Sequence, residues 1–62
     1  MPVITLELAK MSKDKKAELV EKVTKTVAEI SGIPEQAFYV FIKENAPENV
    51  GVGGQLLLDV KK

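Results

Sequence analysis

The sequence predicts an α+β fold in which one helix joins two short parallel strands and a C-terminal loop or hairpin follows. Residues 3–8 alternate apolar and polar side chains from Ile4 onward, which is the period of a half-buried strand. Apolar residues then recur at spacings of three and four, as on one face of a helix. The aromatic and β-branched run Phe38–Ile42 follows as a second strand. Strand, helix and strand in this order indicate a β-α-β unit with a right-handed crossover.

The helix is predicted from about Ser12 to Ser31. Ser12 is a suitable N-cap, and Asp14 falls in the first turn, where the helix dipole favours an anion. Gly32 stands at the position of a C′ residue, and Pro34 prevents continuation of the helix. The predicted buried stripe consists of five apolar residues: Leu19, Val20, Val23, Val27 and Ile30.

The segment after the second strand is rich in turn-forming residues. Residues 45–49, with the sequence NAPEN, indicate a loop, and the glycines of residues 51–54 permit positive φ or a close backbone approach. The last apolar run, residues 55–60, is expected to form a short strand or turn. Residues 56–58 either pack on another subunit or form a terminal amphipathic segment that covers the sheet of their own chain.

Size makes self-association the expected source of stability. The 62 residues predict one domain, residues 1–62, and a domain this small buries only about 60% of the surface that its unfolded chain exposes. Disulfides are excluded because the chain has no cysteine, and no histidine is present to bind zinc. Two strands and one helix also leave sheet edges that must be paired. We therefore expect a symmetric homo-oligomer assembled through sheet pairing, with neither a metal nor a cofactor.

Charge and hydropathy exclude several other classes of partner. Nine lysines balance nine acidic residues, and the chain has no arginine, which argues against nucleic acid as a ligand. No apolar run approaches the roughly 18 residues that span a bilayer, and the N-terminus does not resemble a signal peptide. The expectation is a cytoplasmic protein that does not bind membranes.

Pro2 is the residue with the clearest catalytic potential. Without histidine or cysteine, the chain cannot form a Ser-His or Cys-His arrangement, and its glycine run is not followed by the Lys-Ser/Thr of a phosphate-binding loop. A methionine before a small residue is typically removed, which would leave Pro2 with a secondary amine. Burial in an apolar pocket disfavours the charged form of such an amine and lowers its pKa, so that it can act as a general base at neutral pH.

The motifs around Pro2 extend this interpretation to the whole chain. The Met-Pro-apolar-apolar start, the helix opened by Ser12, a second strand that ends in the sequence IKE, and the loop of residues 50–54, VGVGG, occur together. In these features the chain resembles the 4-oxalocrotonate tautomerase family, and residues 47–54 are most similar to its DmpI-like branch. The resemblance implies β-α-β subunits, dimers joined through their sheets, and a hexamer built as a trimer of such dimers.

The resemblance also implies a chemistry, the cofactor-independent isomerisation of a small 2-hydroxydienoate or enol into its keto form by the N-terminal proline. Well-known members bind the substrate with two arginines and keep the pocket apolar with a phenylalanine. The first arginine falls just before Ser12, where this chain has Lys10 and Met11, the second falls at Tyr39, and the phenylalanine falls at Val50. Pro2 is thus the predicted catalytic residue, and the predicted substrate-binding residues are Lys10, Tyr39 and Val50.

Two hypotheses about function follow from these departures. The first is a tautomerase that acts on a small enol or dienol 2-oxo acid, with a monocarboxylate favoured over a dicarboxylate because arginine is absent. The second is an oligomer that keeps the fold with weak or lost catalysis and serves as a binding or scaffold protein. Pro2 and the glycine loop favour the first, whereas the missing arginines and Val50 favour the second.

Overall fold

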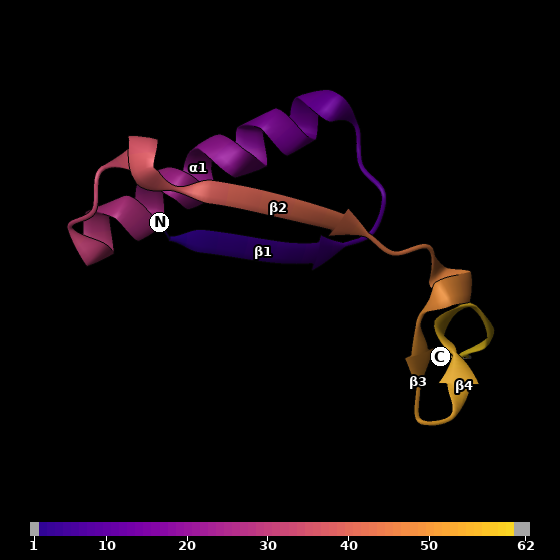
Figure 1. Ribbon diagram of the computed structural model, residues 1–62. Helices are drawn as coiled ribbons and strands as arrows, with labels where there is room; N and C mark the ends of the chain where they lie inside the picture. Colours follow the sequence, from indigo (N-terminus) through magenta and orange to yellow (C-terminus); the bar gives the residue numbers. More distant parts are fainter. Residues whose placement is uncertain (1, 61–62) are drawn as a thin grey trace.

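The computed structural model describes residues 2–60 and confirms the predicted α+β fold class (Figure 1). Strand β1 (Val3–Leu8) leads into helix α1 (Lys13–Ser31), and strand β2 (Tyr39–Glu44) returns parallel to β1. The remaining elements are short: the 3₁₀ turns η1 (Glu35–Ala37), η2 (Pro47–Asn49) and η3 (Leu57–Asp59), and the strands β3 (Gly51–Val52) and β4 (Gln55–Leu56).

The two long strands pair in register from Val3 opposite Tyr39 to Leu8 opposite Glu44. Strand β2 therefore begins and ends later than the predicted range Phe38–Ile42. It begins later because the Phe38 N–H donates to the Glu35 carbonyl at 3.1 Å and closes η1. It extends further because β1 offers partners up to Leu8, whose carbonyl oxygen also accepts the Asn45 N–H at 2.8 Å.

Helix α1 has the two caps that the sequence predicts. Ser12 Oγ accepts the Lys15 N–H at 3.2 Å, and Gly32 adopts φ 76° while its N–H donates to the Ala28 carbonyl at 2.9 Å. The predicted stripe is half-buried except for Ile30, which is 84% exposed. A helix of 19 residues is about 28 Å long, whereas six-residue strands are about 20 Å long. Ile30 therefore lies beyond the sheet, which it cannot contact.

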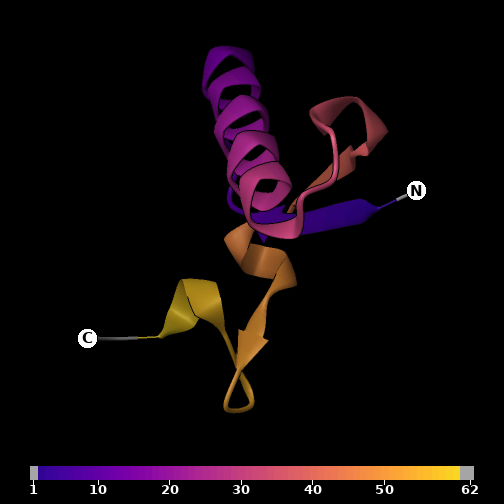
Figure 2. The same cartoon turned by 90° about the vertical axis from the view of Figure 1, so that its left-hand side faces the viewer.

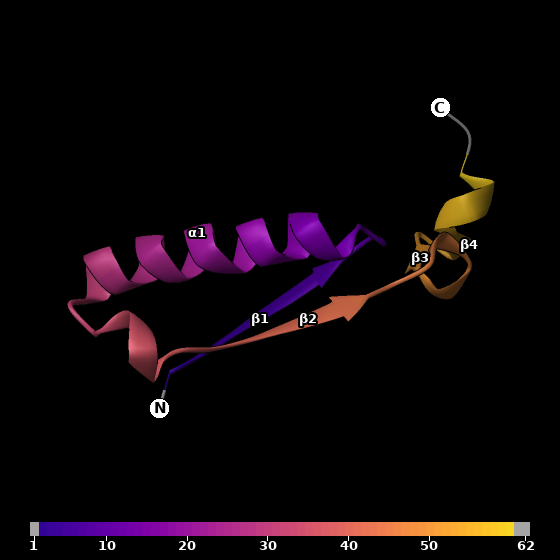
Figure 3. The ribbon, with the colours of Figure 1, turned by 90° about the horizontal axis from the view of Figure 1, so that it is seen from above.

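Helix α1 lies against one face of the sheet, and among residues 2–60 no element lies against the other (Figure 3). The helix-facing side chains of β1 and β2 are half-buried: Ile4, Leu6, Leu8, Val40 and Ile42. The open face carries Val3, Tyr39 and Phe41, which are 50%, 52% and 54% exposed. Both faces thus carry apolar side chains, but this chain covers only one of the faces.

Residues 46–60, here called the C-terminal arm, form a small unit beyond the C-terminal ends of β1 and β2. Figures 1 and 2 show the arm displaced away from α1, toward the open side of the sheet. Strands β3 and β4 form an antiparallel hairpin whose two turn residues, Gly53 and Gly54, both have positive φ, as a tight hairpin turn requires. The Leu57 N–H donates to the Val50 carbonyl at 2.7 Å, so residues 56–58 fold against their own arm and leave their own sheet uncovered.

The chain is too extended to enclose a core. Its radius of gyration is 15.0 Å, whereas a compact domain of this length has about 10.6 Å. The accessible surface of 5193 Å² exceeds the roughly 4,000 Å² of a compact 6.8 kDa monomer. Among residues 2–60 no side chain is fully buried, and no helix has the length and apolar character that crossing a membrane requires. The apolar surfaces of this chain therefore need a partner surface to become a core.

Candidate functional site

The N-terminal end of the sheet brings Pro2 and Tyr39 together. Pro2 is half-buried immediately before β1, and its carbonyl oxygen accepts the Tyr39 N–H at 3.1 Å. Proline at this point costs no sheet hydrogen bond, because it comes before the first paired residue of the strand. The predicted removal of Met1 lies outside the described residues. Pro2 thus stands at the edge of the open apolar face that Val3, Tyr39 and Phe41 form.

A cleft of about 590 Å³ lies at the opposite end, between the C-terminal ends of β1 and β2 and the C-terminal arm. Val50 lines this cleft, as the prediction of an apolar wall requires, together with Leu8, Ala9 and Leu57. Glu7 and Lys43 are its charged lining residues within the part of the chain that the structure describes. Lys10 follows Ala9 directly but lies outside the lining, with an exposed side chain.

The four predicted site residues therefore divide between two ends of one sheet. Six strand residues separate Pro2 from the loop that contains Lys10, and a strand of this length spans about 20 Å. A small enol acid cannot bridge that distance. One chain pairs Pro2 with Tyr39 and places Lys10 and Val50 at the far end, so it does not assemble the whole predicted site by itself.

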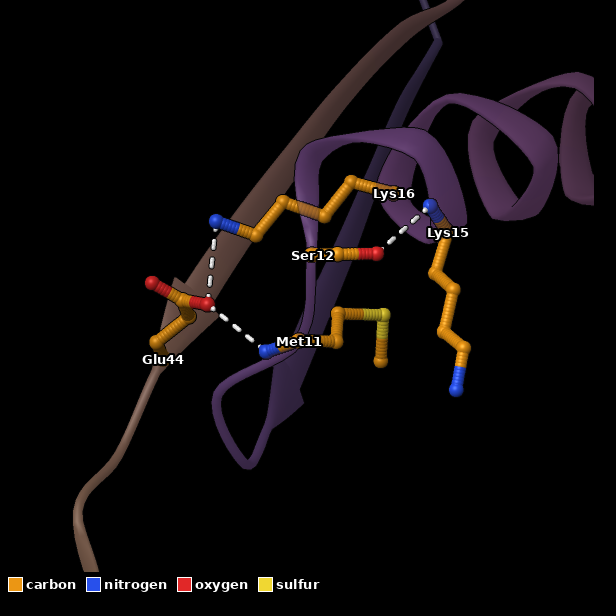
Figure 4. A network of polar contacts seen from close by, with 5 residues as sticks. All are labelled: Met11, Ser12, Lys15, Lys16 and Glu44. Atoms are coloured by element: carbon orange, nitrogen blue, oxygen red, sulfur yellow. Dashed lines mark hydrogen bonds and ion pairs between the residues drawn. The ribbon is translucent and has the colours of Figure 1, made fainter.

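Glu44 holds the loop between β1 and α1 against the end of β2 (Figure 4). Its Oε2 accepts the Met11 N–H at 3.1 Å and lies 2.9 Å from the Lys16 Nζ. The hydrogen bond from Lys16, followed by the one from the Met11 N–H, lowers the pKa of Glu44 from its ordinary value of 4.5. The network fixes the Met11 backbone, and with it the neighbouring Lys10, relative to the sheet.

A second polar contact joins the two strands on the open face of the sheet. The Asn45 Nδ2 donates to Glu7 Oε1 at 3.2 Å, and both residues line the cleft beside Val50. Lys43 stands opposite Glu7 in the strand register. Within residues 2–60 the ion pairs are Lys16 with Glu44 and Lys22 with Glu18, so Lys43 belongs to neither.

A larger cleft, of about 640 Å³, lies between α1 and the edge of β2, but it contains none of the predicted site residues. Its lining includes Val20, Thr24, Phe38 and Val40. This edge of β2 has no strand partner within the described part of the chain, and such an edge is where another strand can add. We therefore assign the candidate site to the cleft beside Val50.

Sequence reasoning missed Lys43 and Glu44 as members of this region. The alternation of β2 places Lys43 on the same face as Tyr39 and Phe41, which was a usable signal for its position on the open side. No comparable signal existed for Glu44, because its partners Met11 and Lys16 precede it by 33 and 28 residues and meet it only through the fold.

Comparisons with known proteins agree with this architecture. The model of the family described as "Tautomerase enzyme" matches residues 2–59. The 2-hydroxymuconate tautomerase of Bacillus subtilis is 37% identical over 62 residues, which are 98% of this chain and 100% of that protein. The crystal structure of DmpI from Archaeoglobus fulgidus superposes with a TM-score of 0.86 at 43% identity, covering 94% of this chain and 100% of that one.

A third similarity points to the same class. The crystal structure of YwhB, a homologue of 4-oxalocrotonate tautomerase, superposes with a TM-score of 0.88 at 34% identity and covers 97% of this chain and 100% of that one. The β-α-β fold of this chain is thus shared with solved structures of tautomerases and their homologues. The chain belongs to the tautomerase family, and the resemblance inferred from its motifs is confirmed.

Proposed function

We propose that the protein is a cofactor-independent tautomerase that converts small 2-hydroxydienoates or enol 2-oxo acids into their keto isomers. The position of Pro2 is the observation that carries this proposal. Pro2 is half-buried at the head of β1, beside the apolar open face of the sheet, in a chain of the tautomerase family. Once Met1 is removed, its nitrogen is a secondary amine without amide resonance. An apolar cover on that nitrogen disfavours the ammonium form, which suits a base at neutral pH.

The proposed reaction needs one proton acceptor and one donor. The Pro2 nitrogen takes the proton of the substrate hydroxyl, and the electron pair of that O–H bond forms the new carbonyl. The former C=C pair then takes the same proton from Pro2 at carbon, so the amine returns to its starting state. In this proposal the Tyr39 hydroxyl, on the strand paired with β1, donates to the substrate oxygen, and Val50 keeps the other end of the pocket apolar.

We propose that each complete site forms between copies of the chain. Pro2 with Tyr39 and Val50 with Lys10 occupy opposite ends of the sheet, so the N-terminal end of one copy must approach the cleft of another. The exposed apolar residues of the open face and the arm supply surface for that assembly. A hexamer made of three sheet-paired dimers satisfies both requirements.

The alternative function, a binding or scaffold oligomer with weak or lost catalysis, has two observations in its favour. The chain has no arginine to grip a carboxylate bidentately, and it has Val50 where the larger aromatic is expected. The two proposals differ in whether Pro2 does chemistry, which can be measured directly.

The deciding experiment compares Met1-free protein with Pro2→Ala on phenylenolpyruvate and 2-hydroxymuconate. Alanine keeps a primary amine but loses the secondary nitrogen and the ring, so kcat should fall by about 10²-fold or more if Pro2 is the base. Intact mass verifies the removal of Met1, and native mass verifies that both proteins form the same oligomer. Equal ketonisation rates would eliminate the Pro2 mechanism, and rates that are both no faster than the uncatalysed reaction would favour the scaffold function.

A further inference from the structure

Among residues 2–60, one cationic side chain lines the cleft beside Val50, and it is not the one that the sequence predicts. Lys43, near the end of β2, lines the cleft, whereas Lys10 does not. The strand alternation places Lys43 on the open face together with Tyr39 and Phe41, on the side toward which the arm is displaced. Because Lys43 lies within a regular strand rather than in a loop, the pleat of the strand fixes the face from which its side chain projects.

An anionic substrate needs such a cation here. The substrates of the proposed function carry a carboxylate, and in a chain without arginine the side chains that can meet this group with a positive charge are those of lysine. Leu8, Ala9 and Val50 make the adjoining wall apolar. Apolar surroundings strengthen a charge-assisted hydrogen bond relative to one in open water.

Glu7 is the group that could compete for Lys43. The two residues are register partners on the same face, and both line the cleft. Yet the structure gives Glu7 a different partner, the Asn45 Nδ2 at 3.2 Å, and neither of the ion pairs found within residues 2–60 involves Lys43. The amide of Asn45 thus holds the competing carboxylate on the strand, and the ammonium of Lys43 remains for a ligand.

We propose that Lys43 is the carboxylate-binding residue of this protein and that it selects anionic over neutral substrates in the cleft beside Val50. This inference rests on the proposed function for its substrate class, but the site itself can be tested without catalysis. Glu7, the register partner of Lys43, weakens binding because its carboxylate repels that of the ligand.

The binding test titrates cinnamate and cinnamamide, two planar ligands of nearly equal shape that differ in charge, into the oligomer and follows amide NMR shifts. Lys43→Met keeps the unbranched apolar stem and removes the ammonium, so the Kd for cinnamate should rise about tenfold, as expected for loss of one partly exposed charge-assisted hydrogen bond. The Kd for cinnamamide should stay within about twofold. Glu7→Gln should tighten cinnamate and leave cinnamamide unchanged.

Control variants separate this site from a general effect of charge. Lys25→Met removes a lysine from an exposed position on α1 and should alter neither Kd. Lys43→Arg should restore cinnamate binding, which a merely structural role for the lysine would not require. Equal losses of cinnamate and cinnamamide in Lys43→Met would overturn the proposal, and so would a loss of cinnamate confined to Lys10→Met.

Kinetics then connect the site to the reaction. With phenylenolpyruvate, Lys43→Met should raise KM about tenfold with a smaller change in kcat, and with the methyl ester of the same enol KM should not change. A protein that binds cinnamate through Lys43 but shows no Pro2-dependent ketonisation would refute the proposed function and keep the carboxylate site. Pro2-dependent ketonisation with an unchanged KM in Lys43→Met would refute the carboxylate site and keep the proposed function.

Discussion

The two ends of the β1–β2 sheet offer different chemistry. The N-terminal end carries Pro2, held by the Tyr39 N–H, on a face of half-exposed apolar side chains. The C-terminal end carries a cleft that the arm closes on one side; within the described residues its lining is apolar and polar except for Lys43 and Glu7. The first end carries the candidate catalytic base, and the second end carries the cleft.

Parallel strands explain why one chain cannot join these halves. In a β-α-β unit both strands run the same way, so residues before the strands and residues after them stay a full strand length apart. In the proposed site, a second copy brings its Pro2 to the cleft of the first. The extended shape and uncovered apolar face of the chain give the same indication independently. Three experiments test this division of the site between copies of the chain.

Mixing two inactive variants tests whether the ends come from different copies. Pro2→Ala removes the base, and Val50→Glu places a carboxylate in the wall of the cleft, so each homo-oligomer should be nearly inactive. In oligomers refolded from equal amounts of both, about a quarter of the sites should combine an intact Pro2 with an intact cleft and recover activity. The ketonisation rate of the mixture measures this fraction. If native mass shows mixed oligomers but the mixture recovers no ketonisation activity, both ends of the site belong to one chain.

Phe41→Lys tests the open face that lies between the two ends. Phe41 is 54% exposed in the single chain, and the proposed assembly buries it, so a lysine there would leave an unpaired buried charge that costs on the order of several kcal/mol. Native mass should fall to a smaller species, and ketonisation should be lost with it. Ile30→Lys is the matched control, because Ile30 is 84% exposed beyond the end of the sheet. An intact oligomer in Phe41→Lys would show that this face does not form the interface.

Glu44→Gln tests the network at the C-terminal end and should have the smallest effect. Lys16 and the Met11 N–H lower the pKa of Glu44 in the folded chain. The network therefore stabilises the folded chain fully at pH values above 4.5, the ordinary pKa of the group. This stabilisation is lost as the pH falls through the lowered pKa. Thermal unfolding should give a lower Tm for Glu44→Gln at pH 7 and equal Tm values near pH 3. A Tm difference that is the same at both pH values would assign the effect to packing rather than to charge.

Local patterns predicted most of the fold because local forces decide it. The caps at Ser12 and Gly32 are properties of a few adjacent residues, and both are present in the structure. The glycines of residues 51–54 were expected to permit positive φ, which Gly53 and Gly54 adopt. The limits of β2 were less predictable. They depend on which residues of β1 remain available for pairing, and the Phe38 N–H is taken by η1 instead. Ile30 fits the helical stripe but is exposed, because the pattern contains no information on where the sheet ends.

The candidate site was predictable only in part, for a related reason. Pro2 and Val50 could be identified from motifs; in the structure Pro2 is half-buried before β1, and Val50 lines the cleft. Their roles and those of Lys10 and Tyr39 remain predictions. Lys43 lines the cleft and Lys10 does not, because of the direction in which the arm leaves the ends of the strands. No short-range sequence pattern predicts the direction of the arm.

The sequence by itself determined the β-α-β order, the helix caps, the hairpin turn and the family of this protein, because these depend on residues close together along the chain or on motifs that stay at fixed spacing. The tertiary structure alone decided which face of the sheet stays open, which lysine enters the cleft, and that Pro2 and the cleft lie at opposite ends. Those features depend on contacts between segments that are distant in sequence, such as Glu44 with Met11 and Lys16, and only the folded chain brings such segments together.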